Sequence, residues 1–501
     1  MTRLHSILRG FGCAVTFGGV LQCYCGDARA DRWQVIPSVT FQELYTSNTQ
    51  GTADETADVV TQVAPGISIN EDGPRSNLVF SYTPTYNHYN FGTSPDRVDQ
   101  SLNGTGKITP SENHLTIDYN AYANEFGGSA NTNNQAGTLL VSSSDRVLYY
   151  AGTVVPHFTE RFGDVATVDA YYRLKSSNTS DQSTHPTGFS LSNDYLQNEG
   201  EVIIGSGDSF GRVSAQLDFD HSVSTGTGEV NGSTNDKDFL GVEYHFNYAY
   251  SLTGQIGYER IFYSATSTTA PFISEGMMWT VGFRIAPNPD SSLSVKYGLQ
   301  EGIYVPTIQA SYAVGPRTTV SLNYTVQVQN QLESALQNLQ FLTYDQFGNP
   351  VDKRTGLPFN LINQTFGSQN VLFRDKPAQL TIVHQLERSA ITLTLLYENR
   401  SSVTGPSSSD EALGASVGYG RQLTPLINGN MNFAYTDHSS TGLVISGGNH
   451  AQLINANASL VCTLSDTASV FVNGTFFKQI SNDPALSSTT AQVIVGVRKA
   501  L

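Results

Sequence analysis

Residues 320–329 read VSLNYTVQVQ, in which apolar and polar side chains alternate without a break. Successive side chains of a β-strand point to opposite faces, so a period of two predicts a strand with one apolar and one polar face. The same period recurs at 115–121, 213–219, 240–246, 252–258, 279–285, 293–299, 391–398, 413–419, 431–435 and 454–460. The chain is therefore expected to be all-β, although a soluble sandwich would alternate in the same way.

The lengths of the connections favour a membrane barrel over a sandwich. Tight turns are expected at 159–164, 287–290, 315–317, 386–389 and 464–466, and longer stretches rich in Ser, Thr, Asn and Gly at 124–144, 176–198, 222–237, 401–411 and 438–449. Short turns at one end and long loops at the other are typical of outer-membrane barrels. We predict an all-β fold, a single antiparallel transmembrane β-barrel of about 22 strands with short periplasmic turns and long extracellular loops.

The longest connection covers residues 330–376. This segment could fold inward as a constriction of the barrel or form an extracellular flap. The hydrophobic periodicity does not distinguish the two arrangements.

The first 30 residues are typical of a secretory signal peptide. Arg3 and Arg9 accompany a short apolar run at 11–21, and an A-x-A cleavage pattern follows at 28–30. We therefore expect Sec-type export and a barrel made of residues 31–501 in the outer membrane of a Gram-negative bacterium. Its partners would be outer-membrane lipid and, during biogenesis, the barrel-assembly machinery.

Composition excludes several classes of protein. The chain has 501 residues, with 27 Lys and Arg against 43 Asp and Glu, so its net charge of -16 argues against a nucleic-acid-binding protein. No run of about 20 apolar residues could form a membrane-spanning helix. After the expected cleavage only Cys462 remains, and the His residues show no metal-binding spacing, so no disulfide, metal or cofactor is expected.

Several short motifs resemble an outer-membrane β-barrel family associated with the PEP-CTERM/exosortase system, which is itself similar to β-barrel porins. The motifs are WQVIPSV at 33–39, YTSN at 45–48, VAPGIS at 63–68, PHFTERFG at 156–163, LERS at 386–389 and YENR at 397–400. The first two are the most specific. The resemblance implies a barrel linked to the export of exopolysaccharide or surface matrix, and it implies no catalytic residues.

The polar faces of the predicted strands would line the lumen. They present seven acids and three bases: Asp118, Asp169, Arg173, Asp218, Asp220, Glu243, Glu259, Arg284, Lys296 and Glu398. Porins select solutes by rings of charge and by pore diameter, so an acidic lining favours cations and neutral sugars over anions. The surrounding Asn, Gln, Thr and Tyr side chains would suit sugar hydroxyls, although any water-filled lumen is polar.

We predict a pore or export conduit for polysaccharide or small hydrophilic solutes, and no enzyme. A non-conducting structural or adhesive barrel is the alternative. A barrel-embedded hydrolase is a third hypothesis, because Glu243 and His245 share a predicted luminal face and residues 207–211 read GDSFG. That sequence matches the nucleophile elbow G-x-S-x-G, which requires a strand–turn–helix, whereas strand-like runs on both sides predict a hairpin turn here.

Overall fold

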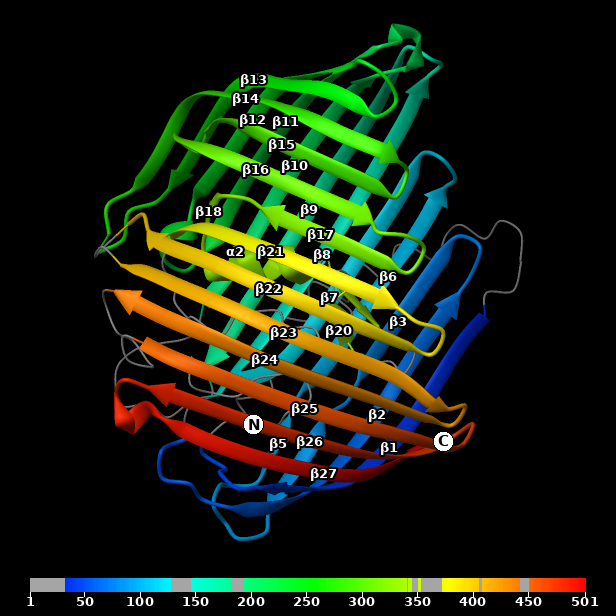
Figure 1. Ribbon diagram of the computed structural model, residues 1–501, viewed down its shortest axis with the longest axis vertical. Helices are drawn as coiled ribbons and strands as arrows, with labels where there is room; N and C mark the ends of the chain where they lie inside the picture. The colour runs from blue at the N-terminus through cyan, green and yellow to red at the C-terminus, as the bar shows by residue number, and fades with distance from the viewer. Residues whose placement is uncertain are drawn as a thin grey trace, which may run out of the picture.

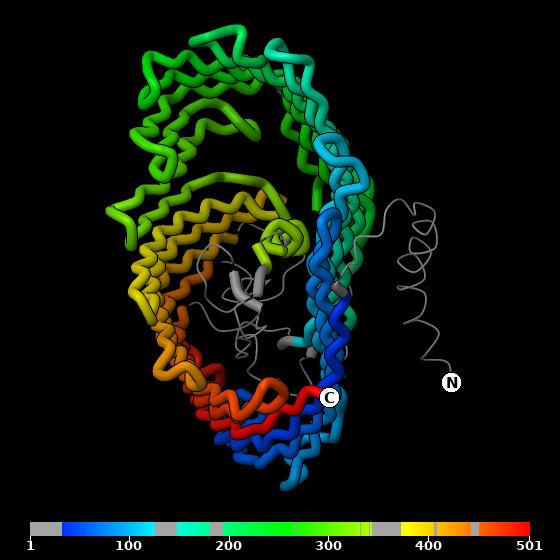
Figure 2. Tube along the Cα trace, turned by 90° about the vertical axis from the view of Figure 1, so that its right-hand side faces the viewer, coloured from blue at the N-terminus to red at the C-terminus, as the bar shows by residue number. Residues whose placement is uncertain are grey.

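The computed structural model describes residues 32–127, 146–181, 193–267, 269–339, 341–344, 350–352, 372–404, 408–441 and 450–501 (Figure 1). The chain forms an antiparallel sheet that closes on itself, because β27 (Ser488–Ala500) pairs with β1 (Arg32–Thr46). In Figure 2 the two ends of the sheet, blue and red, meet at the bottom of an oval ring. The predicted all-β barrel is confirmed.

The wall contains 22 strands, as predicted. The main sheet has 25 strand segments, but β3 and β4 both pair with β2, β5 and β6 continue one another, and β17 and β18 both pair with β21. The remaining segments in chain order are β2 (Asp58–Asp72), β3 (Ser76–Tyr82), β4 (Thr85–Tyr89), β5 (Arg97–Asp99), β6 (Ser101–Ser111), β7 (Leu115–Gly127), β8 (Arg146–Phe162), β9 (Ala166–Asp181), β10 (Asn193–Ser206), β11 (Val213–Gly226), β12 (Ser233–His245), β13 (Tyr250–Tyr263), β14 (Phe272–Asn288), β15 (Ser291–Gln300), β16 (Ile303–Ala313), β17 (Thr318–Tyr324), β18 (Gln327–Gln329), β21 (Phe373–Gln385), β22 (Ser389–Ser402), β23 (Ser409–Thr424), β24 (Ile427–Thr441), β25 (His450–Ser465) and β26 (Ala468–Ser481).

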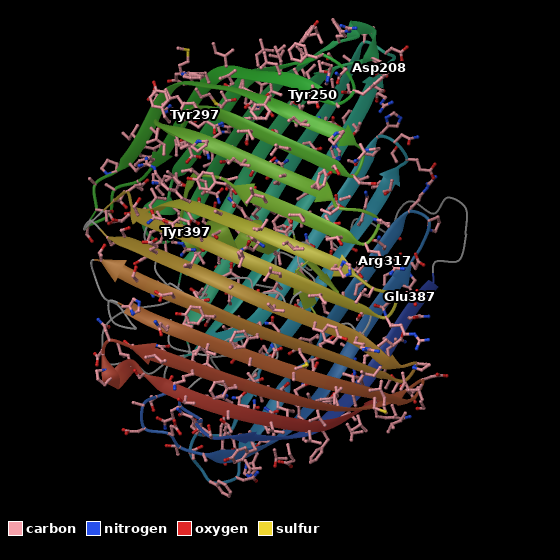
Figure 3. All side chains as sticks on the ribbon, viewed as in Figure 1. Asp208, Tyr250, Tyr297, Arg317, Glu387 and Tyr397 are labelled. Carbon is pink, nitrogen blue, oxygen red and sulfur yellow. The ribbon has the colours of Figure 1, made fainter. Side chains whose placement is uncertain are left out.

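The outer face of the wall is apolar. Tyr250, Tyr297 and Tyr397 are among the many exposed large side chains on it (Figure 3). Lipid offers no hydrogen-bond partners, so a sheet that spans a bilayer must pair every strand edge. Closure leaves no such edge, and the polar face of each strand then turns inward.

The two ends of the barrel differ in their connections. Asp208, Arg317 and Glu387 lie in short connections at one end, on the right in Figure 3. At the other end the strands continue further than the alternation predicted, and β9 and β10 extend into the expected loop 176–198. The reason is that both faces of a strand meet water beyond the bilayer, so pairing continues after the apolar pattern has ended.

Part of the long connection 330–376 forms α2 (Gln331–Leu339), which lies inside the ring of strands (Figure 2). Asn330 caps this helix, because the Glu333 backbone N–H donates to Asn330 Oδ1 at 2.8 Å and the Asn330 N–H donates to Glu333 Oε2 at 2.8 Å. This reciprocal capping box explains where the helix begins. A two-stranded ribbon follows, with β19 (Leu342–Tyr344) paired to β20 (Pro350–Asp352).

Residues 345–349 and 353–371 of that connection lie outside the described residues, as does the expected signal peptide, 1–30. No helix in the described ranges is long and apolar enough to cross a membrane.

Candidate functional site

One apolar stripe of α2 packs against the inner wall. Leu332, Ala335, Leu336 and Leu339 are buried and follow the i, i+3, i+4, i+7 spacing of a single helix face. They belong to one cluster with luminal side chains of β7, β8, β10 and β13, namely Tyr122, Tyr149, Tyr195, Ile261 and Tyr263. Each fully buried leucine contributes about 1.5–3 kcal/mol, so the helix is held firmly against this sector.

Polar contacts fix the position of the helix. The hydroxyl of Tyr195 donates to Glu333 Oε1 at 3.1 Å, and that of Tyr263 donates to Oε2 at 3.1 Å. On the strand before the helix, Val328 N–H donates to Glu301 Oε2 at 2.7 Å. Burial raises the pKa of Glu333 even though three donors surround its carboxyl group. The carboxyl group thus joins α2 to two strands at once.

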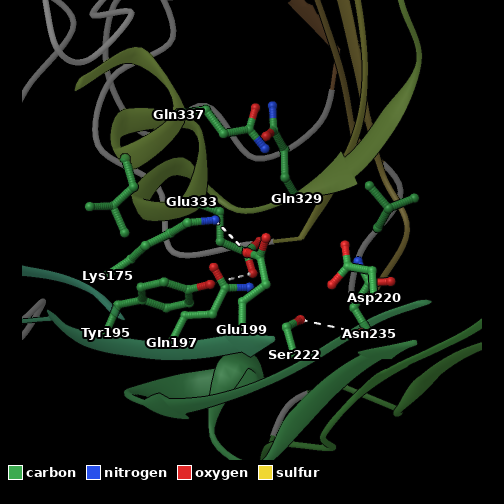
Figure 4. A pocket seen from close by; sticks show the side chains of 12 residues that line it. Lys175, Tyr195, Gln197, Glu199, Asp220, Ser222, Asn235, Gln329, Glu333 and Gln337 are labelled. Atoms are coloured by element: carbon green, nitrogen blue, oxygen red, sulfur yellow. Dashed lines mark hydrogen bonds and ion pairs between the residues drawn. The ribbon is translucent and has the colours of Figure 1, made fainter. Parts of the chain in front are cut away.

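A pocket of about 240 Å³ lies between α2, β18 and the facing strands β9–β12 (Figure 4). Its lining is almost entirely polar and includes Lys175, Glu199, Asp220, Asn235 and Gln329. The side chains come from both the wall and the inward segment, so the pocket exists only while α2 is docked.

The cations beside the pocket are bonded to carboxylates. The Arg173 guanidinium contacts both Glu199 and Glu201, and Lys175 Nζ lies 2.5 Å from Glu199 Oε2. Lys237 Nζ lies 3.1 Å from Glu301 Oε1. Burial makes such pairing necessary, because an ion that leaves water without a partner costs several kcal/mol.

All ten residues predicted to line the pore lie on the inner side of the alternation, opposite the exposed apolar side chains. The structure brings four of them into one region of adjacent strands: Arg173, Asp218, Asp220 and Glu259.

A second group lies nearer the short-turn end, where Arg284 Nη1 is 3.8 Å from Glu243 Oε1 and Lys296 lies on the neighbouring strand β15. Asp118, Asp169 and Glu398 lie elsewhere on the wall. That the ten line a conducting path stays a prediction.

Sequence reasoning missed several luminal charges. Glu199, Glu201 and Lys175 share the inner face with Arg173, and Tyr195 and Gln197 continue the same alternation. That alternation is the available signal for all five residues. Tyr195 and Gln197 fall within the expected loop 176–198, whereas Lys175, Glu199 and Glu201 stand beside it.

A second miss is on β22 and β21. Arg400 Nε lies 2.7 Å from Glu398 Oε1 and 3.7 Å from Asp375 Oδ1, with all three side chains buried. Arg400 stands two residues after Glu398 and so on the same strand face, which was the signal for it.

The GDSFG motif forms the expected hairpin turn, with the short 3-10 helix η3 (Asp208–Phe210) between β10 and β11. A different serine meets His245: Ser214 Oγ lies 2.9 Å from His245 Nε2, while His245 Nδ1 is 3.8 Å from Glu243 Oε1. A catalytic base and its orienting acid usually lie within 2.6–3.2 Å. Glu243 instead accepts a hydrogen bond from Ser251.

The described residues contain no group of three or more His, Cys, Asp and Glu side chains that could hold a metal ion.

Comparisons with known proteins identify the fold. No protein-family model and no curated protein matches the chain. Three solved structures of the FrpB iron transporter from Neisseria meningitidis are similar to it with a TM-score of 0.50 and 11% identity. They are the F5-1 variant, the F3-3 variant and the F5-1 apoprotein form; each match covers 93% of this chain, and 82%, 81% and 81% of theirs. At this identity the similarity shows a shared fold: the chain has the same kind of closed antiparallel β-barrel as these structures.

Proposed function

We propose that this protein is an outer-membrane pore for small hydrophilic solutes, and that α2 narrows its lumen. The observation that carries the proposal is a closed 22-strand barrel whose polar, charged faces turn inward. Apolar side chains outside and ionised side chains inside suit a wall between lipid and water. The outer membrane, reached by Sec-type export, is the location that this architecture favours.

The charges of the lumen favour cations and neutral solutes. Seven of the ten predicted luminal residues are acids, and two of the bases, Arg173 and Arg284, lie beside carboxylates. Anions would therefore meet an excess of negative potential, whereas neutral sugars would meet hydroxyl and amide groups.

Export of surface polysaccharide is the finer form of the proposal. The resemblance of the motifs at 33–39 and 45–48 to barrels of exopolysaccharide systems supports it. A polymer that passes the lumen would require α2 to leave the wall, because the helix lies in its path (Figure 2).

The first test is single-channel conductance of the refolded protein in planar bilayers, with the cation-to-anion permeability ratio. Stable openings with a ratio above one are expected. Liposome swelling with neutral oligosaccharides of increasing length then measures the size limit. A folded, heat-modifiable barrel that neither conducts nor swells liposomes would overturn the pore and favour the structural or adhesive barrel.

A further inference from the structure

The pocket beneath α2 has more hydrogen-bond acceptors than donors. Three oxygens of its lining side chains accept no hydrogen bond: Asp220 Oδ1, Asn235 Oδ1 and Gln329 Oε1. Buried polar atoms in folded proteins are satisfied in the great majority of cases, by protein, water or ligand. Three such oxygens around one pocket are therefore available to a ligand that brings donors.

The orientation of Gln329 is set by its neighbour. This side chain is 5% exposed, and its Nε2 donates to Asp375 Oδ2 at 3.2 Å. A carboxylate can only accept, so the amide nitrogen must face Asp375 and the amide oxygen is left as an acceptor. The acceptor is thus part of a built site, since β18 and β21 hold it in place.

Asp220 is a carboxyl group of the pocket lining to which no cation of the described part of the chain is bonded. The nearby cations are bonded to other acids: Arg173 to Glu199 and Glu201, Lys175 to Glu199, and Lys237 to Glu301. A ligand that sits against Asp220 and supplies a positive charge would complete the pairing of the site. A charge-assisted hydrogen bond is the strong kind.

The size of the pocket limits the ligand. A cavity of about 150 Å³ holds a benzene ring, so about 240 Å³ has room for one six-membered ring with substituents. We propose that this pocket binds a protonated amino sugar of hexosamine size, with its ammonium group at Asp220 and its hydroxyls donating to Gln329 and Asn235. The proposal rests on the proposed function, because it names the class of solute that the pore would recognise.

The test is calorimetric titration of the refolded protein in detergent with glucosamine, glucose and N-acetylglucosamine as probes. Glucosamine is expected to bind at least about tenfold more tightly than either neutral sugar, since only it carries the ammonium group. Equal affinities for the three sugars, or no binding of glucosamine, would overturn the proposal.

Variants locate the site. Asp220→Asn should weaken glucosamine binding about tenfold or more, and Gln329→Leu should weaken both glucosamine and glucose. Asp118→Asn is the matched control, a luminal carboxylate on β7 that does not line the pocket, and it should bind as the unmodified protein does. Heat modifiability checks that each variant folds. Unchanged affinity for glucosamine in both Asp220→Asn and Gln329→Leu would contradict binding in this pocket.

Glucosamine also distinguishes a failure of this binding site from a failure of the proposed pore. Glucosamine should block single-channel current at concentrations near its dissociation constant. A protein that conducts ions but binds no glucosamine would support the proposed pore and contradict the amine-binding site. A protein that binds glucosamine through Asp220 but does not conduct ions would support the amine-binding site and contradict the proposed pore.

Discussion

Two sectors of the inner wall differ in the charge of their inward-facing side chains. On β9–β13 ionisable residues face the lumen, and Glu201, Asp220, Lys237 and Glu259 are direct cross-strand neighbours in turn. On β24–β27 the corresponding row is uncharged: Asn432 lies opposite Asn457, Asn457 opposite Thr475, and Thr475 opposite Gln492. We call these the charged sector and the amide sector.

The outer faces of the two sectors are alike, since Leu217 and Tyr258 on one and Phe433 and Val472 on the other are all exposed and apolar. Lipid imposes this similarity, because it accepts only apolar side chains. The inner face is free of that constraint. α2 packs against β7, β8, β10 and β13, so it lies partly over the charged sector and away from the amide sector.

The largest expected effect comes from removing α2 from the charged sector. Leu339→Asp would place a carboxylate at a position with 0% exposure, which costs several kcal/mol and should undock the helix. Single-channel conductance should rise severalfold, and protease cleavage near residue 339 should appear. Ser334→Asp is the control, since Ser334 lies off the buried stripe. Unchanged conductance in Leu339→Asp would mean that the helix does not narrow the lumen.

The next effect concerns pairing within the charged sector. Arg173→Gln leaves Glu199 and Glu201 without their shared cation, so the barrel should lose about 3 kcal/mol in urea unfolding. The cation-to-anion permeability ratio should rise about tenfold, because one unit charge at about 6 Å in water changes the energies of a cation and of an anion by about 0.7 kcal/mol in opposite directions. A ratio that falls or stays constant would show that this sector does not face the ion path.

A pH titration tests the contact between α2 and the wall. Burial raises the pKa of Glu333, so the protonated carboxyl favours the docked helix. This contribution is complete below the ordinary glutamate pKa and is lost as the pH rises through the higher folded value. Conductance should therefore rise with pH, and Glu333→Gln should reduce that rise. A profile that falls with pH in the unmodified protein would contradict the direction of the shift.

The smallest effect is expected in the amide sector. Asn457→Ala removes no charge, so the permeability ratio should be unchanged, and stability should fall by no more than about 1 kcal/mol. Asn457→Asp is the complementary variant and should raise the ratio as Arg173→Gln does. If Asn457→Ala alters ion selectivity as strongly as Arg173→Gln, the distinction between the two sectors fails.

Much of the wall was predictable, and the inward segment was not. The alternation at 213–219 and 391–398 places Asp218 and Glu398 on the inner face because a β-strand has a strict period of two. The pairing of Arg173 with Glu199 required the register of β9 against β10, which a single strand pattern does not contain. Ser214 beside His245 is a pair of the same kind, formed across β11 and β12.

The all-β barrel, its approximate strand number and the inward orientation of many polar side chains could be predicted from the alternation and the connection lengths. Every strand faces the same lipid and needs an apolar outer face. This requirement can therefore be recognised in the sequence of each strand alone. The folded barrel was needed to show that α2 lies inside it, that Glu333 contacts Tyr195 and Tyr263, and that a pocket forms beside Asp220. These contacts join residues that are distant along the chain. They depend on barrel closure and strand register, which the alternation along a single strand does not contain.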